Sequence, residues 1–348
     1  MPTMPTMPTT IDDLPTPAVV IDAGALGRNL AAMAAVHTGA ALRPHVKAHK
    51  CTALAAAQRA VGHHAFTCAT PREVLGMAAA GLGDDLLLAN ETIDPVRLRA
   101  MAELHDRGDA RVTVAVDSEA TVAAAARAGI REVLVDVDIG LPRCGVAADE
   151  AGRLADRARA LGLEVRGVMG YEGHLMVVDD QGDPDRQERL VEEAVDRLLV
   201  AHAVVGGDVV SSGGTGTHHL HRRRPGVTEV QAGSYALMDS HYGAQGHPFE
   251  QACHVVGTVI SVSRRHAVAD VGLKALGMDH GNPTTSAGSV WFLSDEHLTF
   301  APSSPVSVGD RVYVVPAHID PTLAMHEVAW LASDGEVIDR WPIDLRGW

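Results

Sequence analysis

The sequence predicts an α/β protein, with a (β/α)8 barrel of the TIM type followed by an antiparallel β domain. Three observations lead to this prediction. Short runs rich in β-branched residues alternate with longer segments of helical period up to about residue 235, eight such runs are present, and the helical period is absent after about residue 250. The length of 348 residues suits one large domain and one smaller domain.

The predicted strands of the barrel alternate with helices in the order typical of βα units. These strands cover residues 41–47, 65–69, 85–89, 111–116, 132–138, 164–169, 208–212 and 228–231. The helical period between them is clearest over residues 72–81, 118–129, 147–161 and 187–204. A doubly wound open sheet would need fewer strands, and no GxGxxG motif follows the first of them.

The β domain is predicted from strand-like runs that turn residues separate. These runs cover residues 254–263, 266–272, 289–293, 311–316 and 327–332. Ala18–Asp22 is also strand-like and could add a strand to this domain. We therefore expect a barrel over residues 14–248 and a β domain over residues 249–348. Residues 1–13, with their Met-Pro-Thr repeat, are expected to form a disordered tail, because recurrent proline removes backbone hydrogen bonds.

Composition excludes several classes of protein. The net charge is −15, with 44 acidic against 29 basic residues, which argues against nucleic acid as a partner. The four cysteines lie far apart with no CxxC pair, as expected for reduced thiols in a cytoplasm. No run approaches the ~18–20 apolar residues of a membrane span, and the N-terminus lacks the basic segment of a signal peptide. We expect a cytoplasmic protein that does not bind membranes.

Lysine is rare in this chain, which contains only Lys47, Lys50 and Lys274. Lys47 ends the first predicted strand and Lys50 lies just beyond it, where active sites of such barrels are assembled. With a strand period of two, Arg43, His45 and Lys47 share one face, and a polar face inside a barrel is costly unless it lines a site. A partly desolvated amine beside cations has a lowered pKa and can form a Schiff base. The alternative is that Lys47 and Lys50 are ordinary surface lysines.

A glycine-rich loop follows the seventh predicted strand at residues 213–217. Consecutive glycines let backbone N–H groups converge on an anion, and late barrel strands are a common position for phosphate sites. The loop lacks the lysine of a Walker motif, so a nucleoside triphosphate is not indicated, and a plain turn is the alternative. A second turn, at residues 231–235, could complete the cradle. An amine at one strand end and a phosphate cradle at two others suit pyridoxal phosphate.

Five motifs in order identify a resemblance to a known family. They are 43–50 (RPHVKAHK), 167–174 (GVMGYEGH), 213–217 (GGTGT), 231–235 (QAGSY) and 316–322 (PAHIDPT). Together they resemble the D-threonine aldolase/D-serine dehydratase family, fold-type III pyridoxal phosphate enzymes related to alanine racemase. The resemblance runs from about Leu14 to the C-terminus.

The resemblance implies roles for individual residues. Lys47 would carry the cofactor covalently, Arg143 would lie near its phenolic oxygen, and the uncharged Gln231 near its pyridine nitrogen. His45, Tyr171 and Asp279 are implied to line the site. The full set expected to contact the cofactor is Lys47, Arg143, Tyr171, Ser212, Gly214, Thr215, Gln231, Gly233, Ser234 and Tyr235.

His318 and Asp320 stand two residues apart in a strand-like segment, which would place both side chains on one face. Such a pair is common on protein surfaces, but its place in the matched motif favours a metal site. Histidine plus carboxylate suits Mn²⁺ or Mg²⁺, with Zn²⁺ as an alternative. In the dehydratase branch a cysteine typically stands where this chain has Asp320, so the aldolase branch is favoured.

We therefore expect a lyase that cleaves D-threonine or a similar β-hydroxy-D-amino acid to glycine and an aldehyde. A divalent cation would lower the pKa of the substrate hydroxyl, and His174 or a metal-bound water would accept its proton. The alternatives are a dehydratase of D-serine or D-3-hydroxyaspartate, a non-catalytic pyridoxal phosphate carrier and an amino-acid racemase. The only tyrosine after Tyr242 is Tyr313, which gives the racemase a weak candidate for its second base. The family also implies a homodimer.

Overall fold

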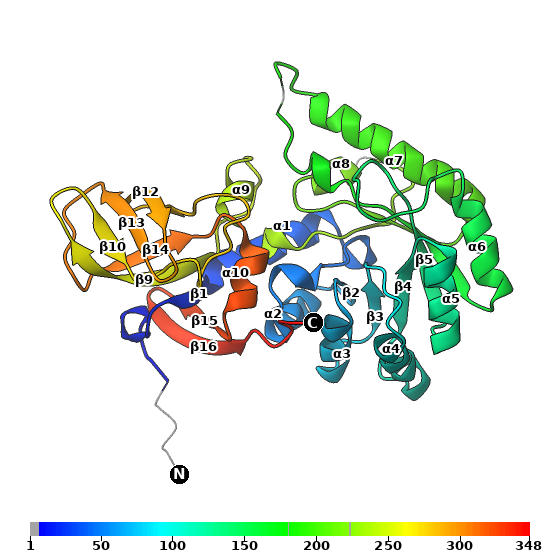
Figure 1. Ribbon diagram of the computed structural model, residues 1–348, viewed down its shortest axis with the longest axis horizontal. Coiled ribbons are helices and arrows are strands. Elements are labelled where there is room, and N and C mark those ends of the chain that lie inside the picture. The colour runs from blue at the N-terminus through cyan, green and yellow to red at the C-terminus, as the bar shows by residue number, and fades with distance from the viewer. Residues whose placement is uncertain (1–6, 180, 223) are drawn as a thin grey trace, which may run out of the picture. The chain divides into compact units, whose positions relative to one another are not determined.

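The computed structural model describes residues 7–179, 181–222 and 224–348, which form two compact units (Figure 1). The α/β unit comprises the described residues of 33–47, 54–233 and 345–348. The β unit comprises the described residues up to 32, together with 48–53 and 234–344. These bounds differ from the predicted division at residue 248, because strand partners far along the chain, rather than chain neighbours, decide which unit a segment joins.

The α/β unit contains a parallel sheet of seven strands in sequential order, β2-β3-β4-β5-β6-β7-β8. Its strands are β2 (Ala65–Cys68), β3 (Asp85–Leu88), β4 (Val112–Val116), β5 (Glu132–Asp136), β6 (Glu164–Met169), β7 (Val209–Ser212) and β8 (Glu229–Val230). The helices between them are α3 (Pro71–Ala79), α4 (Pro95–Arg107), α5 (Glu119–Ala128), α6 (Ala151–Ala160), α7 (Arg186–Val205) and α8 (His218–His221), with the 3-10 turn η4 (Gly173–Leu175) before α7. Seven of the eight predicted barrel strands are therefore confirmed.

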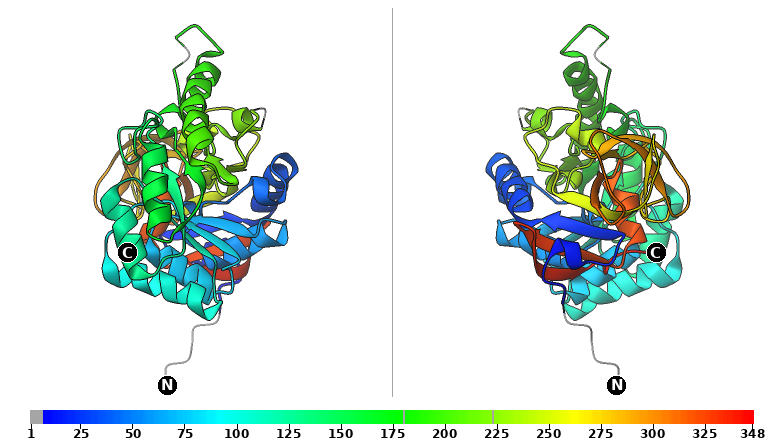
Figure 2. Two further views of the ribbon diagram at one scale, coloured as in Figure 1. Left: turned by 90° about the vertical axis from the view of Figure 1, so that its right-hand side faces the viewer. Right: turned by 90° about the vertical axis from the view of Figure 1, so that its left-hand side faces the viewer.

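The helices α3 to α7 lie in sequence order along the outside of this sheet (Figures 1 and 2). Their apolar faces pack on the strands and form the largest core cluster, which includes Phe66, Leu86, Val135 and Leu198. Capping sets their ends: Asp94 accepts backbone N–H bonds at the start of α4, and Gly108 ends it in a left-handed conformation.

The first predicted strand, residues 41–47, takes a different form. Leu42 bridges Val230 of β8 in parallel, and His45 bridges Thr67 of β2, so this segment joins both outer strands of the sheet. The chain then tightens into a 3-10 turn, η3 (Val46–Ala48), that contains Lys47. The expectation that Arg43, His45 and Lys47 share one strand face is therefore wrong for Lys47, because the extended period stops before it.

The inward side chains of the parallel sheet change character along the strands. At the amino ends they are ionic, since Arg43 binds Asp85 and Glu229. Arg166 also binds Asp85. One step further, the inward residues form the apolar cluster Leu87, Ala115, Leu134 and Met169. The predicted polar face thus includes Arg43, but this side chain lies at the amino ends of the strands. There Arg43, Asp85, Arg166 and Glu229 form a layer that we call the ionic floor. Arg43 does not line the carboxyl ends of the strands.

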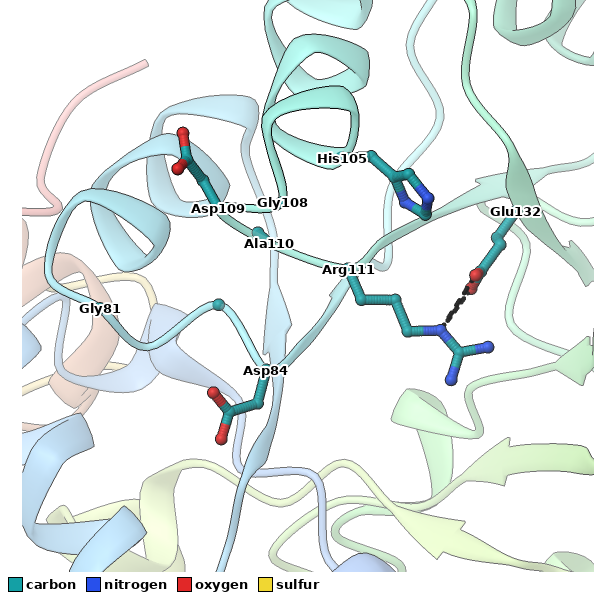
Figure 3. Close-up of a pocket in the computed structure, with 9 residues that line it drawn as sticks. Gly81, Asp84, His105, Gly108, Asp109, Ala110, Arg111 and Glu132 are labelled. Atoms are coloured by element: carbon teal, nitrogen blue, oxygen red, sulfur yellow. Dashed lines mark hydrogen bonds and ion pairs between the residues drawn. The ribbon is translucent and has the colours of Figure 1, made fainter.

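A cavity of about 510 Å³ lies at this amino end, outside the ionic floor. Its lining includes Asp84, His105 and Asp109, together with Arg111 and Glu132, whose side chains form an ion pair of 2.8 Å. Figure 3 shows this pair among the lining residues. The residues that the family motifs place at a site follow the opposite, carboxyl ends of the strands. This cavity is therefore separate from the candidate active site.

The β unit contains a nine-stranded sheet in the order β10-β13-β12-β11-β14-β9-β1-β15-β16. Because β10 also pairs with β9, the six strands from β9 to β14 close on themselves. The strands are β1 (Ala18–Asp22), β9 (Cys253–Val262), β10 (Ala267–Ala269), β11 (Thr284–Thr285), β12 (Gly288–Leu293), β13 (Leu298–Pro302), β14 (Arg311–Val315), β15 (Val328–Ser333) and β16 (Glu336–Pro342). β1 pairs with β9 in antiparallel and with β15 in parallel orientation, so the predicted β domain is not wholly antiparallel.

Two helices bridge the division between the units along the chain, α1 (Ala23–Val36) and α2 (Thr52–Ala60). The β unit adds the short helices α9 (Ser240–Gly243) and α10 (Ile319–Met325) and the 3-10 turns η1 (Ile11–Asp13) and η5 (Ser234–Ala236). The turn η2 (Gly39–Ala41) lies in the α/β unit.

The prediction that His318 and Asp320 lie in a strand is wrong. His318 is the residue before α10, and Asp320 lies in its first turn.

The predicted disordered tail, residues 1–13, falls partly outside the described residues, which begin at Met7. From Thr9 onward the prediction is wrong, because Val337 N donates to Thr9 O and Ile11 N donates to Gly335 O. These bonds tie the segment to the hairpin of β15 and β16.

Within the part of the chain that the structure describes, no helix is both long and apolar enough to cross a membrane.

Candidate active site

Lys47, Arg143 and Tyr171 come together at the carboxyl ends of the parallel strands. The Lys47 Nζ lies 5.9 Å from the centroid of the Tyr171 ring, and the Arg143 Cζ lies 5.5 Å from the same centroid. Tyr171 follows β6, Arg143 lies in the loop after β5, and Lys47 follows the segment that bridges β8 and β2. Two of the residues to which the resemblance gives a role, Lys47 and Arg143, thus flank the ring of a third, Tyr171.

The glycine-rich loop follows β7 and leads into α8. A Cβ on Gly213 would lie 2.6 Å from His221 Cδ2, and one on Gly214 would lie 2.9 Å from Met176 Sδ. At these two positions only glycine fits without displacing neighbours. Ser212 donates its hydroxyl proton to Gly170 O at 2.9 Å and to Glu172 Oε2 at 3.0 Å, so this proton points toward the segment after β6.

The remaining predicted cofactor contacts divide between the two units. In the α/β unit, Gln231 Nε2 donates to Ser211 Oγ at 2.8 Å, Thr215 is buried and Gly233 is the last residue of its chain segment. Ser234 and Tyr235 belong to the β unit. The Tyr235 side chain is fully buried there, with its ring 5.6 Å from that of Phe249.

Acidic side chains lie beside Arg143. Asp136 ends β5, and its carboxyl lines a small cavity together with Arg143, Cys144 and Tyr171. Burial raises the pKa of Asp136 well above its usual range, and the neighbouring Glu91 carboxylate raises it further. Burial and the hydrogen bond with Glu91 also raise the pKa of the Cys144 thiol to about 11. Protonation of the Asp136 carboxyl is therefore more favourable here than in an ordinary aspartate.

His174, the predicted proton acceptor, lies elsewhere. Its exposed ring lines a cavity of about 380 Å³ whose lining also includes Arg186 and Arg197 of α7. Lys47, Arg143 and Tyr171 do not line this cavity. The structure therefore does not bring His174 to the cluster around Tyr171, and its role stays a prediction.

The predicted metal residues lie in the β unit. His318 Nδ1 is 2.6 Å from Asp279 Oδ2, and His318 Nε2 is 3.9 Å from Asp320 Oδ1. The His280 ring stacks on that of His318 with 4.1 Å between centroids. One donor atom each from Asp279, His280 and His318 lies within 4.8 Å of the others. An Asp279 carboxylate on Nδ1 leaves Nε2 of His318 to face a cation.

Neighbouring groups hold this constellation. Lys50 Nζ donates to the backbone O of Asp320 at 2.7 Å, and Ile319 N donates to Asp239 Oδ2 at 3.1 Å. Burial acts to raise the pKa of Asp279, but the hydrogen bond and charge of His318 outweigh it and leave the pKa below its usual value. Asp279 is therefore ionised, as a metal site requires.

Three features escaped the sequence analysis: the buried carboxylate of Glu172, the contact between the Asp136 and Glu91 side chains, and the stacked ring of His280. Glu172 stands inside the motif 167–174, so its position was visible but its contacts were not. Asp136 and Glu91 come from the ends of separate strands and His280 from the loop between β10 and β11, and no local pattern signals their contacts.

Comparison with known proteins identifies the family. The model of the alanine racemase N-terminal domain matches residues 21–241, and a serine dehydratase domain model matches residues 252–332. A D-threonine aldolase from an Arthrobacter species is 33% identical over 355 residues, covering 95% of this chain and 93% of the relative. The chain belongs to the D-threonine aldolase/D-serine dehydratase family.

Solved structures of this family match the whole fold. The D-threonine aldolase of Filomicrobium marinum superposes with a TM-score of 0.91 at 32% identity, covering 99% of each chain. The D-threo-3-hydroxyaspartate dehydratase of Delftia sp. HT23 gives 0.87 at 28% identity, covering 98% of this chain and 100% of that one. Relatives in this family therefore include both aldolases and a dehydratase.

The residues of this chain fit the cofactor and the cation of such enzymes. A lysine amine beside an aromatic ring and a glycine loop that a Cβ would fill suit an aldehyde and a phosphate ester. Imidazole and carboxylate donors within reach of one another suit a divalent cation. The arrangement thus offers an amine, an anion cradle and a cation site.

Proposed function

We propose that the protein is a lyase that uses pyridoxal phosphate and a divalent cation to cleave D-threonine, or a similar β-hydroxy-D-amino acid, into glycine and an aldehyde. The observation that carries the proposal is the donor set around His318. Asp320 offers an oxygen ligand there beside the imidazole of His318, a pair that suits Mn²⁺ or Mg²⁺, and Zn²⁺ is the alternative.

The α/β unit supplies the groups that hold the cofactor. When bound, pyridoxal phosphate supplies an aldehyde for a lysine amine and a ring that accepts the electron pair left on Cα. Lys47 provides the amine, and the Tyr171 ring beside it provides an apolar stacking surface. The amide of Gln231 would face the pyridine nitrogen without forcing its protonation, since an amide carries no charge.

The β unit supplies the groups that act on the substrate hydroxyl. His318 Nε2 and the Asp320 carboxylate would hold a cation, which lowers the pKa of a bound hydroxyl. Asp279 fixes the orientation of the His318 ring through Nδ1. His174 stays the predicted proton acceptor, and loss of turnover in a correctly folded His174→Ala variant would support it.

Product analysis tests the proposal directly. The purified protein is incubated with D-threonine, pyridoxal phosphate and Mn²⁺, with L-threonine as the control substrate. We expect glycine and acetaldehyde from D-threonine alone, and loss of turnover on chelation. A keto acid and ammonia would instead identify the second candidate, a dehydratase, which the match to the Delftia enzyme favours. A variant of that dehydratase has been solved in a metal-free form, so a cation alone does not separate the two reactions.

A double variant tests the cation site. His318→Ala with Asp320→Ala removes both ligands and should abolish turnover while leaving cofactor binding intact. Asp295→Ala with His297→Ala is the matched control, because it removes one exposed aspartate and one exposed histidine from the same unit. Full activity in the first variant would contradict the role of the pair.

Borohydride reduction followed by peptide mapping tests Lys47. We expect a stable adduct at Lys47 and none in Lys47→Ala, whereas Lys274→Ala should behave as wild type, since the Lys274 side chain is exposed and pairs with Glu296. We also propose a homodimer and a cytoplasmic protein, the first tested by light scattering in solution and the second by cell fractionation.

A further inference from the structure

Glu172 is a fully buried carboxylate that the proposed chemistry does not use. It follows β6, within the motif 167–174. Its Oε2 accepts from Ser212 Oγ at 3.0 Å and from Gly213 N at 3.2 Å. Its Oε1 accepts from Thr217 Oγ1 at 2.7 Å and from His221 Nε2 at 2.6 Å. One side chain thus receives four hydrogen bonds.

These four donors enclose the glycine-rich loop from both ends. Ser212 ends β7, Thr217 precedes α8, and His221 lies in α8. The Thr217 hydroxyl also accepts from Gly214 N at 3.2 Å, so its own proton is directed to Glu172. A single carboxylate therefore fixes the strand end, the loop and the helix in one arrangement.

The carboxylate is charged in this setting. Burial acts to raise the pKa of Glu172, but the charge and hydrogen bond of His221 and the hydrogen bond of Thr217 outweigh it and lower the pKa to about 2. The carboxylate repels a phosphate group, although the charge of His221 at 2.6 Å partly offsets this repulsion, and it cannot attract one. If charge were its only effect on the loop, removing it would tighten phosphate binding.

We propose that Glu172 is a positioning residue for the cofactor phosphate, whose carboxylate holds residues 212–217 in the shape that receives the phosphate ester. This inference rests on the proposed function, because it needs a phosphate-bearing cofactor at the loop. Hydrogen bonds to a charged acceptor are about twice as strong as neutral ones, so the carboxylate is a stronger anchor than an amide. An amide would also turn its own N–H groups toward part of the donor set.

Two ligands separate positioning from general damage. Pyridoxal phosphate and pyridoxal carry the same aldehyde, but only the first carries the phosphate. The cofactor-free full-length chain is titrated with each ligand, and the aldehyde adduct is followed by absorbance. In Glu172→Gln we expect the affinity for pyridoxal phosphate to fall about tenfold or more, with the affinity for pyridoxal unchanged. Glu164→Gln changes an exposed glutamate at the start of β6, the strand that precedes Glu172, and should match wild type for both.

Other outcomes would overturn the inference. Unchanged or tighter binding of pyridoxal phosphate by Glu172→Gln would show that the carboxylate acts by charge alone or not at all. An equal loss for both ligands would show damage that is not specific to the phosphate. A wild-type chain that forms no adduct with either ligand would instead refute the proposed function.

A second pair of variants covers the case in which Glu172→Gln does not fold. Thr217→Val removes the hydroxyl that links Glu172 to Gly214 N, whereas Thr217→Ser keeps it. We expect Thr217→Val to lose affinity for pyridoxal phosphate selectively and Thr217→Ser to recover it. Equal affinities in these two variants would contradict the anchoring of the loop through Glu172.

Discussion

Replacing Arg43 with methionine tests the assignment of this side chain to the ionic floor of the parallel sheet. The Arg43 side chain is only 3% exposed, and it binds Glu229 at 2.7 Å and Asp85 at 3.1 Å. Burial acts to lower the pKa of Arg43, but both carboxylates outweigh it and raise the pKa, so the guanidinium is charged. Methionine fills a similar volume and removes the charge.

The expected cost follows from what the substitution leaves behind. Asp85 keeps Arg166 at 2.8 Å as a partner, but the side chain of Glu229, 7% exposed, loses its bond to Arg43. Removing one member of a buried ion pair typically costs about 3–5 kcal/mol. Because Asp85 stays paired, we expect Arg43→Met to lower the free energy of unfolding by about 3 kcal/mol.

Urea unfolding followed by circular dichroism measures this loss. Arg59→Met is the matched control, because Arg59 pairs with Asp84 at an exposed position and should cost no more than about 1 kcal/mol. Adding Glu229→Gln to Arg43→Met should recover part of the stability, since it removes the buried charge that was left. A cost below about 1 kcal/mol, or loss of the adduct at Lys47 with full stability, would refute the assignment of Arg43 to the floor.

Two further predictions concern pH. The pKa of Glu172 is about 2 in the folded chain against an ordinary 4.5, so the unfolded chain takes up the proton first as pH falls. The free energy of unfolding of wild type should therefore fall by on the order of 3 kcal/mol between these two pH values. The free energies of unfolding of wild type and Glu172→Gln are compared at about pH 6 and about pH 3. Wild type should lose more stability between these pH values than the variant, and equal losses would contradict the lowered pKa. The pKa of Asp136 is raised by burial and Glu91, so the folded chain holds its proton more tightly and wild type loses stability as pH rises above 3.8. Asp136→Asn cannot lose this proton, so its stability relative to wild type should rise over that range; a constant difference would argue against the buried proton.

The sequence was sufficient for the parallel strands and for the motifs, but not for the ends of the segments that matter most. The β-branched runs predicted seven strands within a few residues because burial on both faces imposes a strong local pattern. Lys47 was placed in a strand, since nothing local signals the 3-10 turn that follows His45. The run around His318 is equally ambiguous, because a Pro two residues after Ile319 suits both a strand end and the first turn of α10.

Contacts between distant residues account for most of what the sequence could not supply. The resemblance placed Lys47, Arg143 and Tyr171 near one another, and the structure brings them together because the order of parallel strands places their carboxyl ends at one edge. The partners of Glu172 and Asp136 depend on side-chain directions at the ends of separate strands. The assignment of Ala18–Asp22 to a sheet was predictable, but its parallel pairing with β15 was not, since a period of two carries no strand direction.

The way the backbone passes repeatedly between the two units has a practical consequence for protein engineering. A fragment ending at residue 248 would keep β1 but lose β9 and β15, its two hydrogen-bonding neighbours. Val19 and Ile21, fully buried in the intact chain, would then sit on an unprotected edge, which invites aggregation. Grafting the β unit onto another scaffold would therefore require three separate stretches of polypeptide, and a fusion that carries only one of them should yield insoluble material.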